Sequence, residues 1–428
     1  MKKFKTIYLA IGLILLGSLV CQSQNSLVSN AIKAYSEGDF EQAFELTGDA
    51  LVHIDALSGD YIPAAYYYRG KSRIQILRIA LEEGDNERLA GMQNALIESY
   101  YDYNEALKTA NDKLSIDIRR DLADLYSPLL QTGLSALNTA KNDDQPGNVR
   151  ESALQASLGY LQAAANISQT YLVYDLLGQA MMMTGDSSAA LINFNLGIPA
   201  YRERPPATPD FLMAYVYFRK AIIERYFLKD NNKALASLME GQNMLKREYS
   251  KSGGALSRED RQAYESGMID LIGFELDIYL GDPALIDDAL VRFREVMSLY
   301  PEDYDIHVSY ANLLEKVDMN LAIDAYETAI SIDDSRELAY FNLGALYNNL
   351  GSDVYLKGLN EDTDAMADSL YNEANKYFRK AYINMEQAYN RNPKFLPSIR
   401  ALVQLARTLG IEEKAEFYKR KELELRGF

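Results

Sequence analysis

Apolar residues recur at intervals of three and four along almost the whole of this 428-residue chain, while continuous β-branched runs are scarce. This spacing puts the apolar side chains on one face of a helix, whereas a half-buried strand needs strict alternation. A chain patterned in this way buries its apolar faces by packing helix on helix. The sequence therefore predicts an all-α protein.

Pairs of glycine and aspartate divide the helical pattern into segments. Glycine takes the left-handed conformation that ends a helix, and aspartate or serine caps the next helix. Tight turns are therefore predicted at Gly38-Asp39, Gly84-Asp85, Gly185-Asp186, Gly281-Asp282 and Gly351-Ser352-Asp353. Longer loops are expected over residues 142–148, 202–210 and 250–260, none of them long enough to indicate an independent domain.

One segment places a glycine in mid-helix, where glycine costs roughly 1 kcal/mol relative to alanine. Tyr340, Leu343, Gly344 and Tyr347 form an aromatic-x-x-Leu-Gly-x-x-Tyr pattern that resembles the first helix of a tetratricopeptide repeat (TPR). In that family a small residue stands where the second helix packs closely on the first. The resemblance therefore implies that Gly344 serves a contact between helices. Ala374, Phe378 and Ala381 resemble the second helix, after an insertion.

The large residue of this second-helix pattern recurs along the chain, at Tyr103, Tyr160, Phe194, Leu238, Phe293, Tyr326 and Phe378. Two of the intervals, Tyr160 to Phe194 and Phe293 to Tyr326, fall at or next to the 34-residue period of the family. The longer intervals indicate lengthened helices or extra loops, notably over residues 77–96 and 352–373. The best-matching repeats lie near residues 171–200, 212–245, 286–334 and 336–390.

This resemblance implies a right-handed α-solenoid of about eight TPR-like helical hairpins, with lengthened helices and insertions, over residues 24–428. The alternative is an (α/α) toroid of the glycosidase or lyase type. A toroid also explains helical pairs of this length, but it explains the repeat signatures poorly.

Residues 1–23 have the pattern of a secretory signal peptide. Lys2, Lys3 and Lys5 precede an apolar run over residues 7–20, which is too short to span a bilayer comfortably. Cleavage is expected after Ser23, and the alternative is a lipoprotein whose Cys21 carries the lipid. The predicted location is exported, periplasmic or associated with the outer membrane, with membrane association only if Cys21 is lipidated.

The formal net charge is −17, from 44 basic and 61 acidic residues. Such a charge repels nucleic acid and anionic lipid unless a basic patch is segregated. One predicted helix carries Arg69, Lys71, Arg73 and Arg78. These residues are expected to pair with acids of neighbouring helices, and the alternative is docking of an acidic partner segment.

Residues that carry chemistry are sparse. The two histidines, His53 and His307, are far apart, and no cysteine follows Cys21, so a zinc site is not expected. The oxygens of Asn360, Asp362, Asp364 and Asp368 are spaced like the start of a calcium loop, but the required glycine and the closing glutamate are missing. This stretch is predicted to be a soluble insertion loop. No enzyme activity, cofactor, metal or small-molecule substrate is predicted.

The resemblance also implies a concave groove lined by the first helices. It assigns to that groove Asp175, Gln179, Met182, Met183, Arg219, Ile223, Tyr226, Phe227, His307, Phe341, Asn348 and Asn349. Soft side chains and amides suit an extended peptide or an inserted helix, although many of these residues could simply pack between repeats. The predicted function is a non-catalytic protein–protein interaction scaffold or adaptor in a bacterial cell envelope, with other envelope or secreted proteins as its partners.

A second function class remains open because the chain has 32 tyrosines and no tryptophan. The clusters Tyr66-Tyr67-Tyr68 and Tyr100-Tyr101-Tyr103 cannot all face inward on one helix, so some of these rings should be exposed. Exposed aromatic rings stack on sugars. The alternative prediction is therefore a carbohydrate-binding protein or a glycan-active enzyme on a helical toroid.

Overall fold

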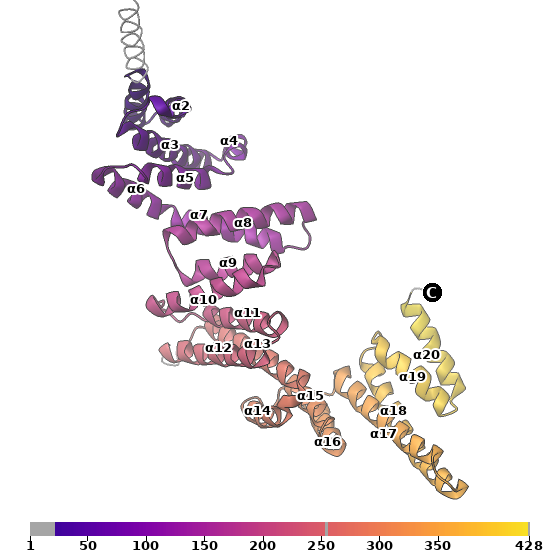
Figure 1. The fold of residues 1–428 in the computed structure, drawn as a ribbon. Coiled ribbons are helices and arrows are strands. Elements are labelled where there is room, and N and C mark those ends of the chain that lie inside the picture. Colours follow the sequence, from indigo (N-terminus) through magenta and orange to yellow (C-terminus); the bar gives the residue numbers. More distant parts are fainter. Residues whose placement is uncertain (1–21, 253–255, 427–428) are drawn as a thin grey trace, which may run out of the picture. The chain divides into compact units, whose positions relative to one another are not determined.

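The computed structural model describes residues 22–252 and 256–426 (Figure 1). Every regular element in these residues is a helix, which confirms the predicted all-α class. Cys21 and nearly all of the predicted leader lie outside the described residues. The chain divides into two compact units, one ending at Asp260 and the other beginning at Arg261. At this point the sequence indicated only a loop.

The N-terminal unit is a series of helical hairpins. Residues 22–37 form its first helix, and α3 packs on α5, α7 on α8, α9 on α10, and α11 on α12. The elements are α2 (Phe40–Val52), η1 (Ile54–Ala56), α3 (Tyr61–Glu83), α4 (Asn86–Gly91), α5 (Ala95–Leu107), α6 (Asp112–Asp124), α7 (Tyr126–Lys141), α8 (Gly147–Ile167), α9 (Tyr171–Met183), α10 (Ser187–Glu203), α11 (Leu212–Tyr226) and α12 (Asn231–Lys251).

The C-terminal unit continues in the same way, with α15 packed on α16, α17 on α18, and α19 on α20. Helix α13 begins just before the boundary and lies mostly in this unit. The elements are α13 (Arg258–Gly281), η2 (Pro283–Leu285), α14 (Ile286–Leu299), α15 (Tyr304–Leu314), α16 (Met319–Ile332), α17 (Glu337–Leu359), α18 (Asp364–Arg391), α19 (Leu396–Thr408) and α20 (Glu412–Leu425).

The predicted glycine–aspartate turns separate helices as expected at most positions. Between α9 and α10, Gly185 has a φ of 83°, a left-handed conformation that favours glycine. The side chain of Asp186 then accepts a hydrogen bond of 2.9 Å from the amide of Ala189 and so caps α10. Gly38 and Asp39 do the same before α2, where Asp39 accepts from the amide of Gln42 at 3.0 Å.

The mid-helix glycines of the repeat signature lie at contacts between the helices of a hairpin. A Cβ atom on Gly344 would lie 3.1 Å from the side chain of Met385 and 3.2 Å from the carbonyl oxygen of Ala381 on α18. A Cβ atom on Gly178 of α9 would overlap the fully buried ring of Phe194 on α10. The prediction that Gly344 serves a close approach of two helices is confirmed.

The turn predicted at Gly351-Ser352-Asp353 is wrong, because α17 runs unbroken through it to Leu359. Gly351 is a contact glycine, and a Cβ atom on it would lie 2.8 Å from the ring of Phe378. Gly358 faces Tyr371 at the same distance. Glycines seven residues apart return to nearly the same helix face, so Gly344, Gly351 and Gly358 all lie against α18. The expected insertion is therefore an extension of both helices, not a long loop.

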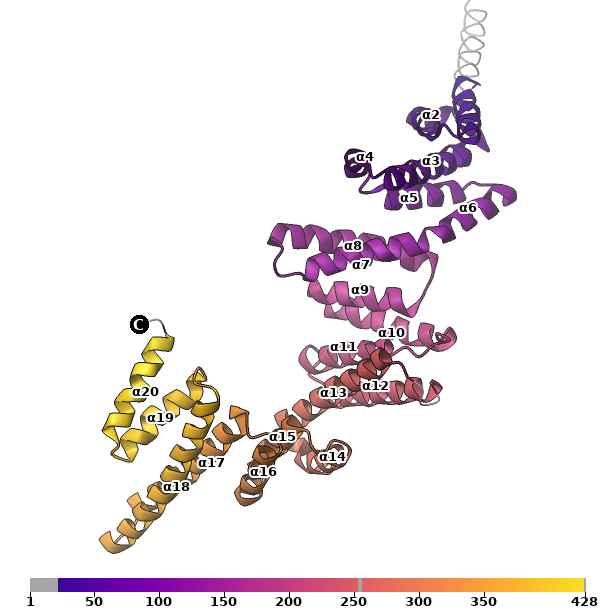
Figure 2. The same ribbon diagram turned by 180° about the vertical axis from the view of Figure 1, so that it is seen from behind.

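Within each unit the buried side chains join consecutive hairpins. In the N-terminal unit one cluster runs from Tyr67 to Ala180 and includes Leu161 and Leu177. In the C-terminal unit a second cluster runs from Tyr304 to Tyr418. Figure 1 and Figure 2, which show opposite sides, place each hairpin beside the next one along the chain within its own unit. This packing of each repeat on the next is that of an α-solenoid and confirms the predicted fold.

Candidate functional site

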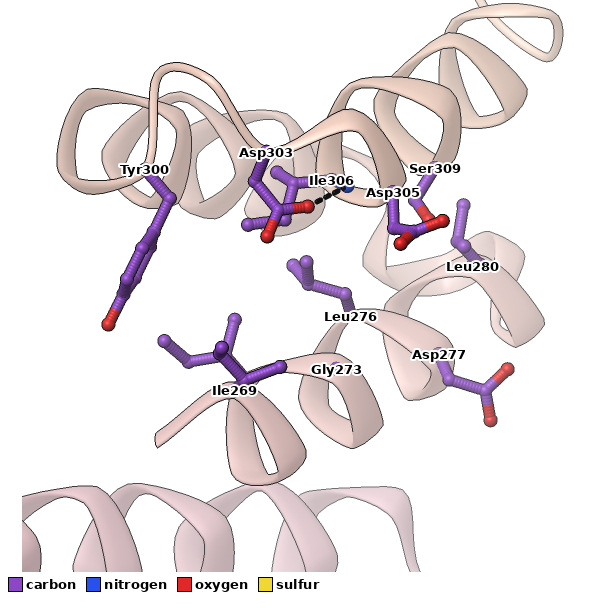
Figure 3. A pocket seen from close by; sticks show the side chains of 11 residues that line it. Ile269, Gly273, Leu276, Asp277, Leu280, Tyr300, Asp303, Asp305, Ile306 and Ser309 are labelled. Atoms are coloured by element: carbon purple, nitrogen blue, oxygen red, sulfur yellow. Dashed lines mark hydrogen bonds between the residues drawn. The ribbon is translucent and has the colours of Figure 1, made fainter. Parts of the chain in front are cut away.

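The candidate site is a cleft of about 220 Å³ between α13 and the start of α15, in the C-terminal unit (Figure 3). In the TPR-like pattern α13 and α15 are the first helices of consecutive hairpins. The lining comprises Ile269, Ile272, Gly273, Leu276, Asp277 and Leu280 of α13, together with Tyr300, Asp303, Asp305, Ile306 and Ser309.

Helical spacing produces the apolar floor of this cleft. Ile269, Leu276 and Leu280 follow one another at intervals of seven and four residues, so they lie on one face of α13. Ile269 is 51% exposed, whereas Leu276 is buried at 3% exposure. Between them stands Gly273, where an added Cβ atom would find no heavy atom of the described residues within 4 Å, apart from its own helix turn. Gly273 therefore does not pack against another helix, and its missing side chain leaves space above the floor of the cleft.

Acidic groups border the apolar floor. Asp303 caps α15 by accepting a hydrogen bond of 3.0 Å from the amide of Ile306, as Figure 3 shows. Asp305 pairs with Arg336 at 2.7 Å, and Asp277 is exposed. The pKa of Tyr300 is raised, mainly by burial and also by its acidic and phenolic neighbours, so its hydroxyl remains a neutral hydrogen-bond donor. The cleft is suited to an apolar group with a positive charge beside it.

Three of the predicted groove residues meet in the N-terminal unit. The guanidinium of Arg219 on α11 donates to Asp175 on α9 at 2.7 Å, and Asp175 is only 6% exposed. Gln179 donates to Asp175 at 2.7 Å and accepts from Lys141 of α7 at 2.5 Å. The pKa of Lys141 is lowered, first by burial and then by the nearby Arg219. These groups already satisfy one another across three first helices.

The other groove candidates of this unit differ in exposure. Ile223 is buried in the core at 2% exposure, so its side chain is not on the surface. Met182 packs against the same core cluster, whereas Met183 is 36% exposed. Tyr226 and Phe227, at the end of α11, are each 54% exposed.

The remaining candidates lie in the C-terminal unit. A ring nitrogen of His307 lies 3.0 Å from the carbonyl oxygen of Pro301. Phe341 is partly buried and makes an edge-to-face contact with Phe395. Asn348 is half-buried and Asn349 is exposed on α17. The twelve predicted residues are thus divided between two units, and none of them lines the α13–α15 cleft.

Three of the four basic residues that the sequence indicated on α3 pair with acids, and the fourth, Arg78, is exposed. Arg73 bonds Asp102 at 2.6 Å and Glu98 at 3.1 Å, and Arg69 also bonds Asp102. Lys71 lies 3.3 Å from Asp121 of α6. The partners stand on the neighbouring helices α5 and α6, so these cations are occupied within the fold.

The tyrosine clusters are mostly inside. Tyr67, Tyr100 and Tyr103 are buried, Tyr66 and Tyr68 are partly buried, and Tyr101 is 58% exposed. This confirms that some of the rings are exposed. A single tyrosine ring that is more than half exposed, however, does not make an aromatic platform for a sugar.

Residues 22–252 and 256–426 contain no group of three or more His, Cys, Asp or Glu side chains placed to hold a metal ion. The calcium-like stretch is split between the short loop after Leu359 and the first turns of α18, which begins at Asp364. Among the same residues, no helix combines the length and the apolar character that a membrane span requires.

No family model matches the chain, and no curated protein matches it. Among solved structures, MamA protein is similar at 15% identity with a TM-score of 0.27, covering 60% of this chain and 92% of that one. The TPR domain of P58(IPK) is similar at 12% identity and a TM-score of 0.28, covering 92% and 99%. Yeast Tom70 is similar at 12% identity and a TM-score of 0.28, covering 94% and 92%.

These TM-scores are low, so the description of the fold rests on the hairpins themselves. The hairpins follow one another along the chain, and signature glycines lie against large residues of the second helices. In its fold, the chain is a helical-repeat protein of the tetratricopeptide type.

Proposed function

We propose that this chain is a non-catalytic protein–protein interaction scaffold, and that it holds an apolar segment of a partner protein in the α13–α15 cleft. The observation that carries the proposal is an apolar cleft against a first helix, where Ile269 is half exposed and Gly273 is uncovered above the buried Ile272 and Leu276. An apolar surface left open in a folded helical array marks an interaction site.

The size and the charge of the cleft support a protein partner over a small molecule. Pockets for small molecules have volumes of about 300 to 1,000 Å³, and this cleft of about 220 Å³ is smaller. It has room for one or two large side chains that anchor a longer segment. Asp277 and Asp303 at the border favour a segment whose anchor is flanked by lysine or arginine, while Asp305 is already paired with Arg336.

The test selects random short peptides displayed on phage against the full chain, and then measures their affinity for two glycine variants. Gly273→Leu fills the cleft. Gly159→Leu is the matched control, because Gly159 on α8 is also a helical glycine with open space around it. We expect selected peptides to carry an apolar anchor with basic neighbours, and to bind Gly273→Leu at least about tenfold more weakly. The control should bind like the wild type.

Two results would contradict this function. Either the selection yields no peptide that binds the wild type, or the selected peptides bind Gly273→Leu as tightly as they bind the Gly159→Leu control. In the second case the partner site lies elsewhere, and the exposed Tyr226 and Phe227 become the next positions to substitute.

We further propose that the chain works after export, in a bacterial cell envelope. Support comes from the sequence, where three lysines precede the apolar run over residues 7–20. Alkaline phosphatase, which is active only outside the cytoplasm, should gain activity when it is fused after Ser23. Leu15→Arg, a charge in the middle of the apolar run, should abolish that activity, whereas activity that survives Leu15→Arg would count against export by this leader.

A separate experiment tests lipidation of Cys21. Incorporation of labelled palmitate that Cys21→Ser removes would identify the lipoprotein form.

A further inference from the structure

The outer half of the α17–α18 hairpin extends beyond the helices on either side of it. Helix α17 has 23 residues and α18 has 28, whereas α15 has 11 and α19 has 13. At 1.5 Å per residue, α17 is about 34 Å long and its neighbours are about 17 to 20 Å long. Figure 1 and Figure 2 both show the end of this hairpin projecting past α19. We call residues 352–373 the arm.

The arm is a packed structure. Gly351 lies against Phe378 and Gly358 against Tyr371, which brings the two helices close together. The rings of Tyr355 and Tyr371 are 4.9 Å apart across the hairpin. These contacts fix the direction of the side chains on the outer surface of the arm.

The outer surface of the arm exposes four large apolar side chains. Tyr355 is 44% exposed, and Leu356, Leu359 and Met366 are 55%, 57% and 57% exposed. At about 100° per residue, Tyr355, Leu356 and Leu359 fall within a sector of about 100° on α17. They form one stripe, which we call the arm stripe. Exposed apolar side chains gathered on one face mark an interaction surface.

The arm stripe continues the face that carries two of the predicted groove residues. Phe341 and Asn348 precede Leu359 by 18 and 11 residues, close to five and three full helical turns, so all three point in nearly the same direction. At the inner end Phe341 is covered by Phe395. At the outer end the neighbouring helices are too short to cover the stripe.

The charge of the arm indicates which kind of partner binds over the arm stripe. The arm carries one basic residue, Lys357, and none of its acids forms an ion pair within the described part of the chain. The acids are Asp353, Glu361, Asp362, Asp364, Asp368 and Glu373. Unpaired carboxylates around an apolar stripe attract a cationic surface. They repel an anionic lipid surface and the arm of a second copy of this chain.

We propose that the arm is a second docking surface, and that it binds a basic amphipathic helix of a partner protein. The apolar side of that helix packs on Tyr355, Leu356 and Leu359, and its lysines or arginines lie near the carboxylates of the arm. This surface is separate from the α13–α15 cleft and does not depend on it.

The test measures binding of a fluorescent synthetic helix, with leucine on one face and lysine on the other, to the full chain by anisotropy. The arm variant combines Leu356→Ser with Leu359→Ser. A matched control combines Ile192→Ser with Leu196→Ser on α10, because these side chains are also exposed and are also close together on one helix. Gly273→Leu tests the cleft in the same assay.

We expect the arm variant to bind the peptide at least about tenfold more weakly, and the α10 control and Gly273→Leu to bind it like the wild type. A peptide with glutamate in place of lysine should not bind. The proposal is overturned if the arm variant binds like the wild type, or if the glutamate peptide binds equally well. It is also overturned if the wild type, but not the arm variant, sediments with vesicles of phosphatidylcholine and phosphatidylglycerol. Loss of binding in Gly273→Leu alone would support the cleft and overturn the arm.

Discussion

Helices α17 and α13 each place a glycine in mid-helix and use it in opposite ways. Gly344 of α17 lies against Met385 and Ala381 of the paired helix, so its missing side chain makes room for a neighbour. Among the described residues, Gly273 of α13 has no neighbour beyond its own helix turn within 4 Å of where a Cβ atom would stand, so its missing side chain leaves room for a partner. Both glycines forgo the same helix propensity, roughly 1 kcal/mol relative to alanine.

The comparison teaches that a helical glycine indicates a contact in one case and an opening in the other. The sign of its effect on stability distinguishes the two cases. A side chain added at a contact must displace a neighbour, while a side chain added at an opening gains helix propensity without a clash. Substitution of glycine by alanine along this chain is therefore a direct test of the assignment.

The largest effect is expected at Gly178, where a Cβ atom would overlap the buried ring of Phe194. Gly178→Ala should destabilise the N-terminal unit by about 1 to 3 kcal/mol, because crowding in a packed core outweighs the gain in helix propensity. The measurement is the urea midpoint of unfolding. Gly159→Ala in the same unit, at an open helical site, is the control and should not lower that midpoint. If Gly178→Ala leaves the urea midpoint unchanged, the contact between Gly178 and Phe194 is not a tight one, and Gly178 does not belong with the contact glycines.

A smaller loss is expected at Gly351, where the ring of Phe378 lies 2.8 Å from the added Cβ. Gly351→Ala should cost about 1 kcal/mol, because this contact lies at the base of the arm, where the two helices are free to shift apart. Hydrogen exchange of the backbone amides over residues 352–373 should become faster. Unchanged exchange there would show that Gly351 does not hold the two helices of the arm together.

The sequence predicted the fold because its signals are local. A glycine followed by an aspartate indicates a turn wherever that aspartate caps the next helix, as Asp186 caps α10 after Gly185. The same local rule was wrong at Gly351, whose role depends on Phe378, 27 residues further along the chain. The spacing of seven between Gly344, Gly351 and Gly358 was the available signal for a continuous hairpin.

The site was less predictable than the fold. Groove positions were assigned by their place in the repeat pattern, and burial then separated Ile223 in the core from Tyr226 and Phe227 on the surface. That separation depends on how the next hairpin packs, which no local pattern fixes. The α13–α15 cleft was missed because α13 carries no match to the first-helix signature. The sign of it in the sequence was an apolar stripe from Ile269 to Leu280 that includes Gly273.

A gain in stability is expected at Gly273. Gly273→Ala should stabilise the C-terminal unit by about 0.5 to 1 kcal/mol, because the backbone is helical and the added methyl group meets no atom. The urea midpoint of that unit should rise, and affinity for peptides selected on the wild type should fall. Stability and binding would then change in opposite directions. A lower midpoint would show that Gly273 is covered by the fold and would move it to the same class as Gly344.

The smallest effect is expected at Gly344 itself, because its nearest neighbour is adjustable. The Cε of Met385 lies at the end of a flexible side chain, 3.1 Å from the added Cβ, and methionine repacks at little cost. Gly344→Ala should leave stability within about 0.5 kcal/mol of the wild type, since helix propensity offsets the crowding. In a Met385→Leu background the branched side chain adapts less well, so the same substitution should become destabilising. If the two substitutions are additive in urea unfolding, Met385 does not set the spacing at Gly344, and the carbonyl oxygen of Ala381 is then the atom that limits how closely α17 and α18 approach.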